Sequence, residues 1–426
     1  MILGRIKRTL GIGAAVIVVV VGGTIALANT STKAAPIVQT IKPLPMTADL
    51  HAKNLNLSGM ASELIDANTG QILYAHNITV RHYPASLVKM MTSLIAFDAV
   101  HHHQLTLNSI IPVDQNAFTV AQTPGLSVAY LNPSEKIPLW KMFEYMYIVS
   151  ADDAAVALGD ALGGSPNAFA VMMNQKAKSL GLTGTHYTNA SGLQDPKQYT
   201  NAQDMAKLAR YLINKDPIVL KYASMKGMYI HPGQYGPNYD QLLGQYQGLD
   251  GLKTGSTNQA GYCFVGTAKR GNLRLISVVL DAPSFQNVFQ DTQELLDYGF
   301  HQFHQQIFQK ANVPLTQSIF VKNGSTQLIQ IAPHQNVLLS TMKGEGNPQV
   351  VVSTTSTTAP IKAGQQIGFE QIVVGKGNTV LKVPVYAVKS DPTVNFLVKI
   401  WRSVFASAHQ GAKHLVSFAL KKLGKL

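Results

Sequence analysis

The chain has 426 residues, of which 46% are hydrophobic and only 13% charged, so it is too apolar for a disordered protein and long enough for two or three domains. Its formal net charge is +13, but residues 1–28 contribute three cations and residues 392–426 contribute six, with no acidic residue in either segment. The 363 residues between them carry only +4, which disfavours a basic body that binds nucleic acid. A single cysteine, Cys263, excludes an intramolecular disulfide framework and a cysteine-based zinc cluster.

The N-terminus has the organisation of an export signal. Three cations within residues 5–8 precede a largely apolar run, residues 10–28, that ends in the small-x-small sequence Ala-Leu-Ala. Because positive charge stays on the cytoplasmic side, the rest of the chain is predicted to lie outside the cytoplasm. We predict a signal peptide over residues 1–28, with an uncleaved anchor as the alternative, since about 20 apolar residues just span a bilayer. Residues 29–47 are polar and proline-containing and are predicted to be a linker.

Helical and strand-like patterns alternate between residues 48 and 303. The strand-like stretches are residues 60–66 and 71–75, joined by a tight turn, and residues 262–268 and 273–280, joined by a turn at 270–272. Apolar residues recur at helical spacing over residues 86–100, 153–162, 168–180, 202–213 and 290–300. This mixture predicts one α/β (α+β) domain over residues 48–303.

The pattern changes over residues 312–390. Val, Thr, Gln and Ile alternate there, Gly and Pro interrupt them, and no strong helical period appears, which predicts a small all-β domain. Beyond Pro392 the chain contains neither proline nor acid, and apolar residues recur mostly at spacings of three and four with cations on the other faces. We predict an amphipathic helix over residues 391–426 on the surface of an anionic membrane; the alternative is a helix docked on the protein's own body.

Ser86 and Lys89 form the first of three short segments that can carry chemistry. They stand at i and i+3 at the start of a predicted helix, so the hydroxyl and the amine share one face. A lysine with a lowered pKa can take the serine proton, and N–H groups at the helix N-terminus can stabilise an oxyanion. Alone, Ser-x-x-Lys is a weak signal, because the same pattern occurs at ordinary surface helix starts.

Two later segments complete an ordered set. Ser150-Ala151-Asp152 stands just ahead of a predicted helix, and a second run begins a predicted strand, Lys253-Thr254-Gly255-Ser256. The order Ser-x-x-Lys, Ser-x-(Asn-like), Lys-Thr-Gly is the signature set of penicillin-binding proteins and serine β-lactamases. Three matches in order are far more specific than any one of them.

The resemblance narrows to the low-molecular-mass penicillin-binding proteins of the D-alanyl-D-alanine carboxypeptidase family of serine peptidases. It is carried most closely by residues 83–92, 188–193, 199–206 and 251–265. Members of that family also carry an export signal, a β-rich C-terminal domain and a terminal amphipathic helix, so the resemblance extends to the organisation of the whole chain. The resemblance implies a transpeptidase-like (serine β-lactamase-like) catalytic domain, with an antiparallel sheet flanked by helices, followed by the small all-β domain.

The same resemblance implies roles for the catalytic residues. Ser86 is implied to be the nucleophile that forms the acyl-enzyme, and Lys89 its general base. Ser150 is implied to pass a proton to the leaving D-alanine. The implied reaction removes the terminal D-alanine from peptidoglycan stem peptides, with β-lactam antibiotics as covalent inhibitors, at the outer face of the cell membrane.

Substrate binding is implied for the remaining motif residues. Lys253 is implied to place positive charge beside Ser150, and Thr254 to help bind the terminal carboxylate of the substrate. Backbone N–H groups of Ser86 and Ser256 are implied to form the oxyanion hole. We predict no metal ion, no cofactor and no nucleic-acid partner, and the predicted substrate-binding residues are Asp152, Lys253, Thr254, Gly255 and Ser256.

Two departures from the family pattern keep alternatives open. The second motif ends in Asp152 where relatives have Asn, which keeps an acceptor and loses a donor, and the loop 283–290 lacks the arginine that many relatives place there. Both motivate a catalytically weak protein that binds or scaffolds the cell wall. A serine β-lactamase is the third interpretation, and it is disfavoured because no glutamate lies between Glu144 and Glu294 to activate a deacylating water.

Overall fold

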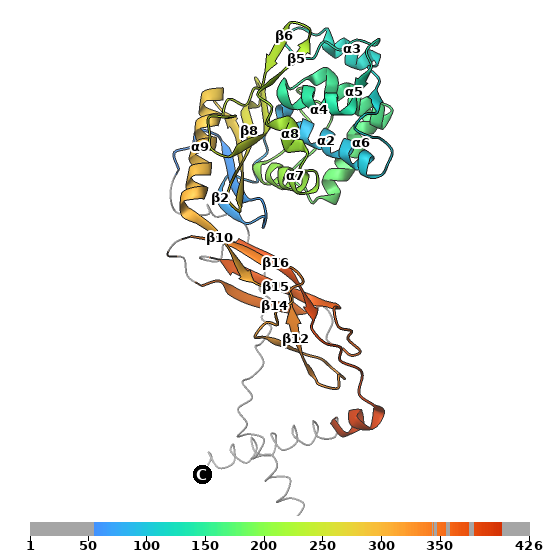
Figure 1. Ribbon diagram of the computed structural model, residues 1–426, viewed down its shortest axis with the longest axis vertical. Helices are drawn as coiled ribbons and strands as arrows, with labels where there is room; N and C mark the ends of the chain where they lie inside the picture. The colour runs from blue at the N-terminus through green and yellow to red at the C-terminus, as the bar shows by residue number, and fades with distance from the viewer. Residues whose placement is uncertain (1–54, 343, 345–346, 355–357, 375–378, 403–426) are drawn as a thin grey trace, which may run out of the picture.

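The structure is a computed structural model in which two lobes follow one another along the chain (Figure 1). It describes residues 55–342, 344, 347–354, 358–374 and 379–402. The predicted signal peptide, the predicted linker and most of the predicted terminal helix lie outside these residues and stay predictions. Among the residues described, no helix is both long enough and apolar enough to cross a membrane.

A five-stranded antiparallel sheet forms the centre of the first lobe, with strand order β2-β1-β9-β8-β7. Its strands are β1 (Ala61–Asp66), β2 (Ile72–His76), β7 (Leu249–Thr257), β8 (Gly261–Arg270) and β9 (Leu273–Ala282). Side chains along β9 alternate between two cores: Ile276 and Val278 face the helical core, and Leu275 and Val279 face the opposite one. Both faces of the sheet are therefore covered.

Helices cover the two faces unequally. Figure 1 shows α9 (Phe285–Gln302) on one face and the remaining helices gathered on the other. These are the 3-10 turn η1 (Ala85–Val88), α2 (Lys89–His101), α3 (Gln115–Ala121), α4 (Leu139–Ile148), α5 (Asp152–Gly163), α6 (Pro166–Ser179), α7 (Ala202–Lys215) and α8 (Val219–Ala223). Two short antiparallel pairs complete the lobe: β3 (Ile110–Ile111) with β4 (Ile137–Pro138), and β5 (Gly227–His231) with β6 (Gln234–Pro237). The predicted antiparallel sheet flanked by helices is confirmed.

Local sequence explains where several helices begin. The Asn201 side chain accepts a hydrogen bond from the N–H of Asp204 at 2.8 Å and caps α7, and Ser284 caps α9 in the same way. Ser165 caps α6 ahead of a proline at the first helical position. These caps satisfy N–H groups that have no partner within the helix.

The second lobe is built from strands. It contains β10 (Phe303–Gln309), β11 (Ser318–Phe320), β12 (Leu328–Ala332), β13 (Val337–Met342), β14 (Gln349–Thr354), β15 (Gln366–Val374) and β16 (Thr379–Ala387). One sheet has the order β11-β12-β16-β15-β14, and β10 pairs with β13. The described residues of this lobe contain no helix before residue 396, so its predicted all-β character is confirmed.

The end of the described chain begins a helix at residue 396, where the Asn395 side chain accepts the N–H of Val398. The start lies beyond residue 391 because Asp391 is used elsewhere: its buried carboxylate accepts hydrogen bonds from Ser325 and Thr326. The apolar side chains of this first turn and a half are mostly well exposed: Phe396, Leu397, Ile400 and Trp401.

Candidate active site

The predicted nucleophile lies at a sharp turn into the first long helix. Ser86 is in η1, directly before α2, and Ala85 ahead of it has a left-handed φ of 46°. A neighbouring loop closes over this turn, because a Cβ added at Gly192 would lie 2.0 Å from the Ala85 carbonyl oxygen. With a φ of 98°, Gly192 meets both demands that only glycine satisfies easily, close approach and positive φ. Local strain at Ala85 is thus supported by tertiary packing.

Lys89 is the centre of a buried hydrogen-bond cluster. Its side chain is 0% exposed, and its Nζ donates to Ser86 Oγ at 2.9 Å, to Asp152 Oδ1 at 2.6 Å and to the Ser191 carbonyl oxygen at 2.7 Å. Three acceptors match the three N–H bonds of a protonated amine. The structure therefore joins Ser86 and Asp152 through one lysine, although Lys89 and Asp152 are 63 residues apart in the chain.

A second buried amine lies beside the second predicted serine. Lys253 Nζ donates to Ser150 Oγ at 3.0 Å and to the Thr254 carbonyl oxygen at 2.9 Å, and the lysine is 1% exposed. Burial lowers the pKa of Lys253 well below its usual value, and the positive charge of Lys89 acts in the same direction. A neutral amine at Lys253 is therefore accessible at a much lower pH than for an exposed lysine.

The carboxylates of α5 hold the second motif in place. Asp152 is at the first turn of α5 and is nearly buried, and its N–H donates to the Ser127 carbonyl oxygen at 2.7 Å. The next residue, Asp153, is fully buried and accepts the N–H groups of Ala129 and Leu131. An acid in the first turn also suits the positive end of the helix. The loop before Leu131 is thereby fixed beside the cluster.

The third motif lies on an edge strand that passes the nucleophile. β7 is the last strand of the sheet, and a Cβ added at Gly255 would lie 3.0 Å from the Ser86 backbone nitrogen. The β7 backbone therefore runs close to Ser86, and its outer edge has no strand partner among the described residues. Thr254 is nearly buried and Ser256 is exposed, one on each side of Gly255. An edge strand next to a nucleophile can bind an extended peptide.

The three predicted segments thus meet at one place. Two residues that contribute to it carry no role in the sequence analysis: Ser191, through its carbonyl oxygen on Lys89, and Asp240, whose buried carboxyl raises the pKa of Lys253 against the effect of burial. Ser191 falls inside the matched run 188–193, which was the available sequence signal. Asp240 had no signal, since only the fold places it near Lys253.

Cys263 does not compete as a nucleophile. It is buried in β8 opposite Gly255, and burial raises the pKa of its thiol to about 12. The described residues contain no group of three or more His, Cys, Asp or Glu side chains that could hold a metal ion.

Comparison with known proteins agrees with this geometry. Residues 49–284 match the family model of D-alanyl-D-alanine carboxypeptidases. The chain is 31% identical to D-alanyl-D-alanine carboxypeptidase DacF of Bacillus subtilis over 335 residues, which cover 77% of this chain and 84% of that protein. It is 28% identical to D-alanyl-D-alanine carboxypeptidase DacA of Escherichia coli over 369 residues, 82% of this chain and 90% of that one.

Solved structures show the same similarity. Penicillin binding protein 5 from Haemophilus influenzae aligns with a TM-score of 0.72 at 27% identity, covering 80% of this chain and 100% of that chain. A penicillin-binding protein from Listeria monocytogenes, solved in its ampicillin-bound form, aligns at 35% identity with a TM-score of 0.53, covering 58% of this chain. The chain therefore belongs to the D-alanyl-D-alanine carboxypeptidase family.

Proposed function

We propose that this chain is a serine D-Ala-D-Ala carboxypeptidase that removes the terminal D-alanine from peptidoglycan stem peptides and binds penicillin covalently. The observation that carries the proposal is the partly buried 2.9 Å hydrogen bond between Lys89 Nζ and Ser86 Oγ. A nucleophile with a base in hydrogen-bond contact, next to a strand edge, is the arrangement that acyl transfer to serine requires.

Acylation begins when Ser86 Oγ attacks the carbonyl carbon of the penultimate D-alanine. The Oγ–C bond forms as the hydroxyl proton passes to Lys89 in its neutral form, and the protonated Lys89 donates a hydrogen bond to Asp152 at 2.6 Å. The C–N bond to the terminal D-alanine then breaks, and the leaving nitrogen takes a proton from Ser150, which Lys253 restores.

Deacylation completes the hydrolysis. A water adds to the ester carbonyl and gives its proton through Ser150 to Lys253. The bond to Ser86 breaks as Ser86 takes back its proton from Lys89, and the shortened peptide leaves with a free carboxylate. The N–H groups of Ser86 and Ser256 stabilise the oxyanion in both steps. Lys253, Thr254 and the β7 edge bind the terminal carboxylate and the peptide backbone of the substrate.

The location follows from the termini. The basic, apolar segment 1–28 exports the chain, and the basic amphipathic segment 391–426 attaches it to the outer face of the cell membrane. The exposed apolar side chains at Phe396, Leu397 and Trp401 support this attachment.

A second candidate function is supported by one specific contact. The Lys89–Asp152 ion pair occupies the amine that must accept the serine proton, and relatives with Asn lack this charge. In this alternative the protein binds the cell wall with little turnover. Family membership and the intact contact between Ser86 and Lys89 favour the enzyme.

The deciding experiment is intact-mass spectrometry of the protein after incubation with penicillin, followed by peptide mapping and a D-alanine release assay on a pentapeptide ending in D-Ala-D-Ala. We expect one stable adduct on Ser86 and release of D-alanine. Ser86→Ala abolishes both, and Ser179→Ala, an exposed serine at the end of α6, changes neither.

An adduct without D-alanine release would support the weak wall-binding alternative. Labelling that survives Ser86→Ala would disprove the assignment of the nucleophile. A hydrolysed β-lactam without a stable adduct would point to the β-lactamase interpretation.

A further inference from the structure

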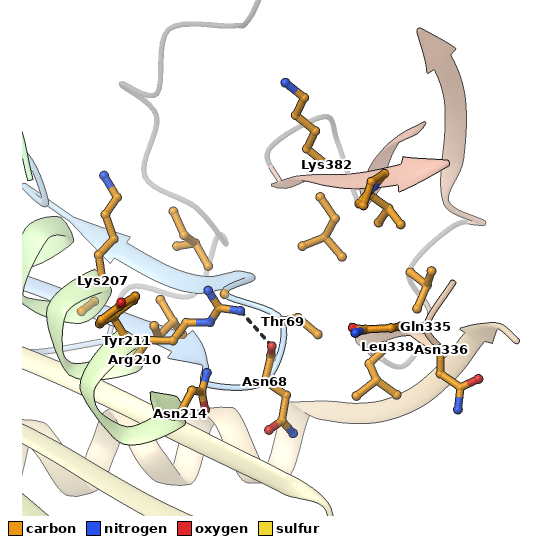
Figure 2. Close-up of a pocket in the computed structure, with 18 of the residues that line it drawn as sticks. Asn68, Thr69, Lys207, Arg210, Tyr211, Asn214, Gln335, Asn336, Leu338 and Lys382 are labelled. Carbon is orange, nitrogen blue, oxygen red and sulfur yellow. Dashed lines mark hydrogen bonds between the residues drawn. The ribbon is translucent and has the colours of Figure 1, made fainter. Parts of the chain in front are cut away.

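A large cleft lies where the two lobes meet, away from the Ser86 cluster. Its volume is about 1180 Å³, and its walls come from α7 and the β1–β2 turn on one side and from residues 333–338 and 381–386 of the second lobe on the other (Figure 2). None of the residues assigned above to catalysis or peptide binding lines it. It is therefore separate from the candidate active site.

The charges that line this cleft are nearly all positive. Its lining includes four cations, Lys207, Arg210, Lys215 and Lys382, and one acid, Glu63. Glu63 is 1% exposed, and burial raises its pKa to about 8, which favours its uncharged form. Its burial also keeps this side chain away from a ligand in the cleft.

Partners inside the protein neutralise these cations only in part. Lys215 is paired with Asp98, and Lys207 lies 3.8 Å from Asp204, a long ion pair with a half-exposed lysine. Lys382 lies 4.2 Å above the Phe369 ring and has no acidic partner among the described residues. Figure 2 shows Lys207 and Lys382 on opposite walls, with both side chains pointing to the same side of the cleft.

Arg210 is a fixed cation on the wall formed by α7 and the β1–β2 turn. Its Nη2 donates to the Asn68 carbonyl oxygen (Figure 2) and its Nε to the Ala67 carbonyl oxygen, both at 2.9 Å. Gly70 allows the turn to pack on the guanidinium, since an added Cβ would lie 3.1 Å from its central carbon. Both hydrogen-bond partners are neutral carbonyl oxygens, which orient the guanidinium, and Nη1 makes no hydrogen bond with the described residues. Burial lowers the pKa of Arg210, and the nearby Asp66 carboxyl acts against this effect.

The rest of the lining suits a sugar chain. Amide side chains supply donors and acceptors from both walls, and aromatic rings supply flat apolar surface, including the His334–Tyr386 pair stacked at 3.6 Å. The amides are Asn68, Gln203, Asn214, Gln335 and Asn336, and the third ring is Tyr211. Amides that hydrogen-bond hydroxyl groups and rings that cover apolar faces match a carbohydrate, and the cations match carboxylates on peptides attached to it.

Buried hydrogen bonds hold the two walls together. Gln71 and Ser340 exchange two, at 2.6 and 3.0 Å, and Asp66 Oδ2 accepts from Ser340 Oγ at 2.6 Å and from Gln305 Nε2 at 2.8 Å. Each of these bonds joins the β1–β2 hairpin to β10 or β13. The cleft is therefore preformed, which reduces the entropy that a ligand loses on binding.

We propose that this cleft binds a strand of peptidoglycan, through the sugars of its glycan and through carboxylates of the stem peptides attached to it. The identity of the polymer rests on the proposed function. The negative charge of the ligand is inferred from the cations that line the cleft. The two terminal segments of the chain next to the described residues do not complement the charge of the site: residues 29–54 contain three lysines and one aspartate, and residues 403–426 contain lysines without an acid. The glycan is held at the lobe junction while one of its peptides reaches Ser86.

The test is co-sedimentation of the full chain, carrying Ser86→Ala, with peptidoglycan sacculi freed of phosphate-containing polymers. We expect Lys207→Glu combined with Lys382→Glu to weaken binding roughly tenfold at low salt, because each accessible charge pair is worth a factor of a few. The matched control, Lys136→Glu with Lys221→Glu, makes the same charge change at exposed lysines outside the cleft and retains binding. Soluble glycan fragments with free carboxylates compete, and neutral chitin oligosaccharides do not.

Equal loss in the cleft and control variants, or competition by neutral oligosaccharides, would overturn the inference. A second readout separates this inference from the proposed function. With Ser86 intact, the cleft variant keeps penicillin labelling and D-alanine release from a short pentapeptide, which also shows that it is folded. Absence of penicillin labelling in the unmodified protein would disprove the proposed enzyme function. The co-sedimentation result would still decide whether the cleft binds the strand.

Discussion

The active site and the cleft between the lobes use the same kind of side chain in opposite settings. Lys89 and Lys253 are buried, and their amines donate hydrogen bonds to other groups of the protein. In contrast, the Lys207 side chain is 46% exposed, and Lys382 has no acidic partner among the described residues. Burial makes the protonation of an amine depend on its neighbours, so it can exchange protons in a reaction. Exposure keeps the amine charged, so it acts through attraction alone.

The largest expected effect tests the buried side of this comparison. Lys253→Gln removes the amine that bonds Ser150, and we expect penicillin acylation of Ser86 to slow by about 10²–10⁴, the usual range for a proton-transfer group. Lys382→Gln in the cleft leaves the rate unchanged. The acylation rate is measured by mass spectrometry of samples quenched at successive times. Equal rates for the two variants would show that Lys253 does not take part in acylation.

The same rate has a pH dependence with a definite sign. Because burial lowers the pKa of Lys253, its neutral form appears at a pH below that of an exposed lysine. We expect acylation to fall with rising pH there, because Lys253 then lacks the proton that it returns to Ser150 and the charge that binds the substrate carboxylate. A Lys253→Arg variant keeps its charge over the same range and lacks this fall. A pH profile shared by the variant and the unmodified protein would contradict the role of Lys253.

Glu63→Gln tests the one buried acid of the cleft. The unfolded chain releases this proton above about pH 4.5, but the folded chain keeps it until about pH 8, so folding is disfavoured increasingly between those values. Relative to the Gln variant, the unmodified protein loses roughly a few kcal/mol of unfolding free energy across this range, since one pKa unit corresponds to about 1.4 kcal/mol. Denaturant titrations at pH 5 and pH 8 measure it, and a constant difference would mean that Glu63 is ionised in the folded state.

The smallest expected effect concerns Asp152, the carboxylate that accepts a hydrogen bond from Lys89 but not from Lys253. Asp152→Asn keeps an oxygen acceptor for Lys89 and removes the negative charge, so the neutral amine forms more easily. We expect D-alanine release to stay unchanged or to rise by a few-fold. Steady-state kinetics on the pentapeptide measure it, and a large loss would give Asp152 its own role in catalysis.

Much of the fold was predictable because local signals agree with it. The helices over 168–180 and 202–213 have caps and an apolar stripe, and the strands over 262–268 and 273–280 are apolar runs around a glycine turn. In contrast, α4 was not predicted. It is buried on most sides, with Met142, Phe143, Met146 and Ile148 among its core residues, so its sequence lacks the polar face that marks a surface helix.

The candidate site divides in the same way. Ser86, Lys89, Ser150 and Lys253 were proposed from motif order, because proton transfer and acyl transfer restrict the residue types that can serve, and their catalytic roles stay predictions. The contact of Asp152 with Lys89 rather than Lys253, and the contribution of the Ser191 carbonyl, depend on distances that no spacing in the chain encodes.

By itself, the sequence determined the strand and all-β patterns, the basic apolar ends of this protein and the choice of candidate catalytic residues. These depend on interactions within a few residues, where periodicity, capping and turn geometry act. The tertiary structure alone decided that Lys89 and Lys253 share one buried cluster, that β7 passes Ser86, and that a positive cleft opens between the lobes. Those features depend on burial and on contacts between distant segments, and the free energy of both is set only when the chain is packed.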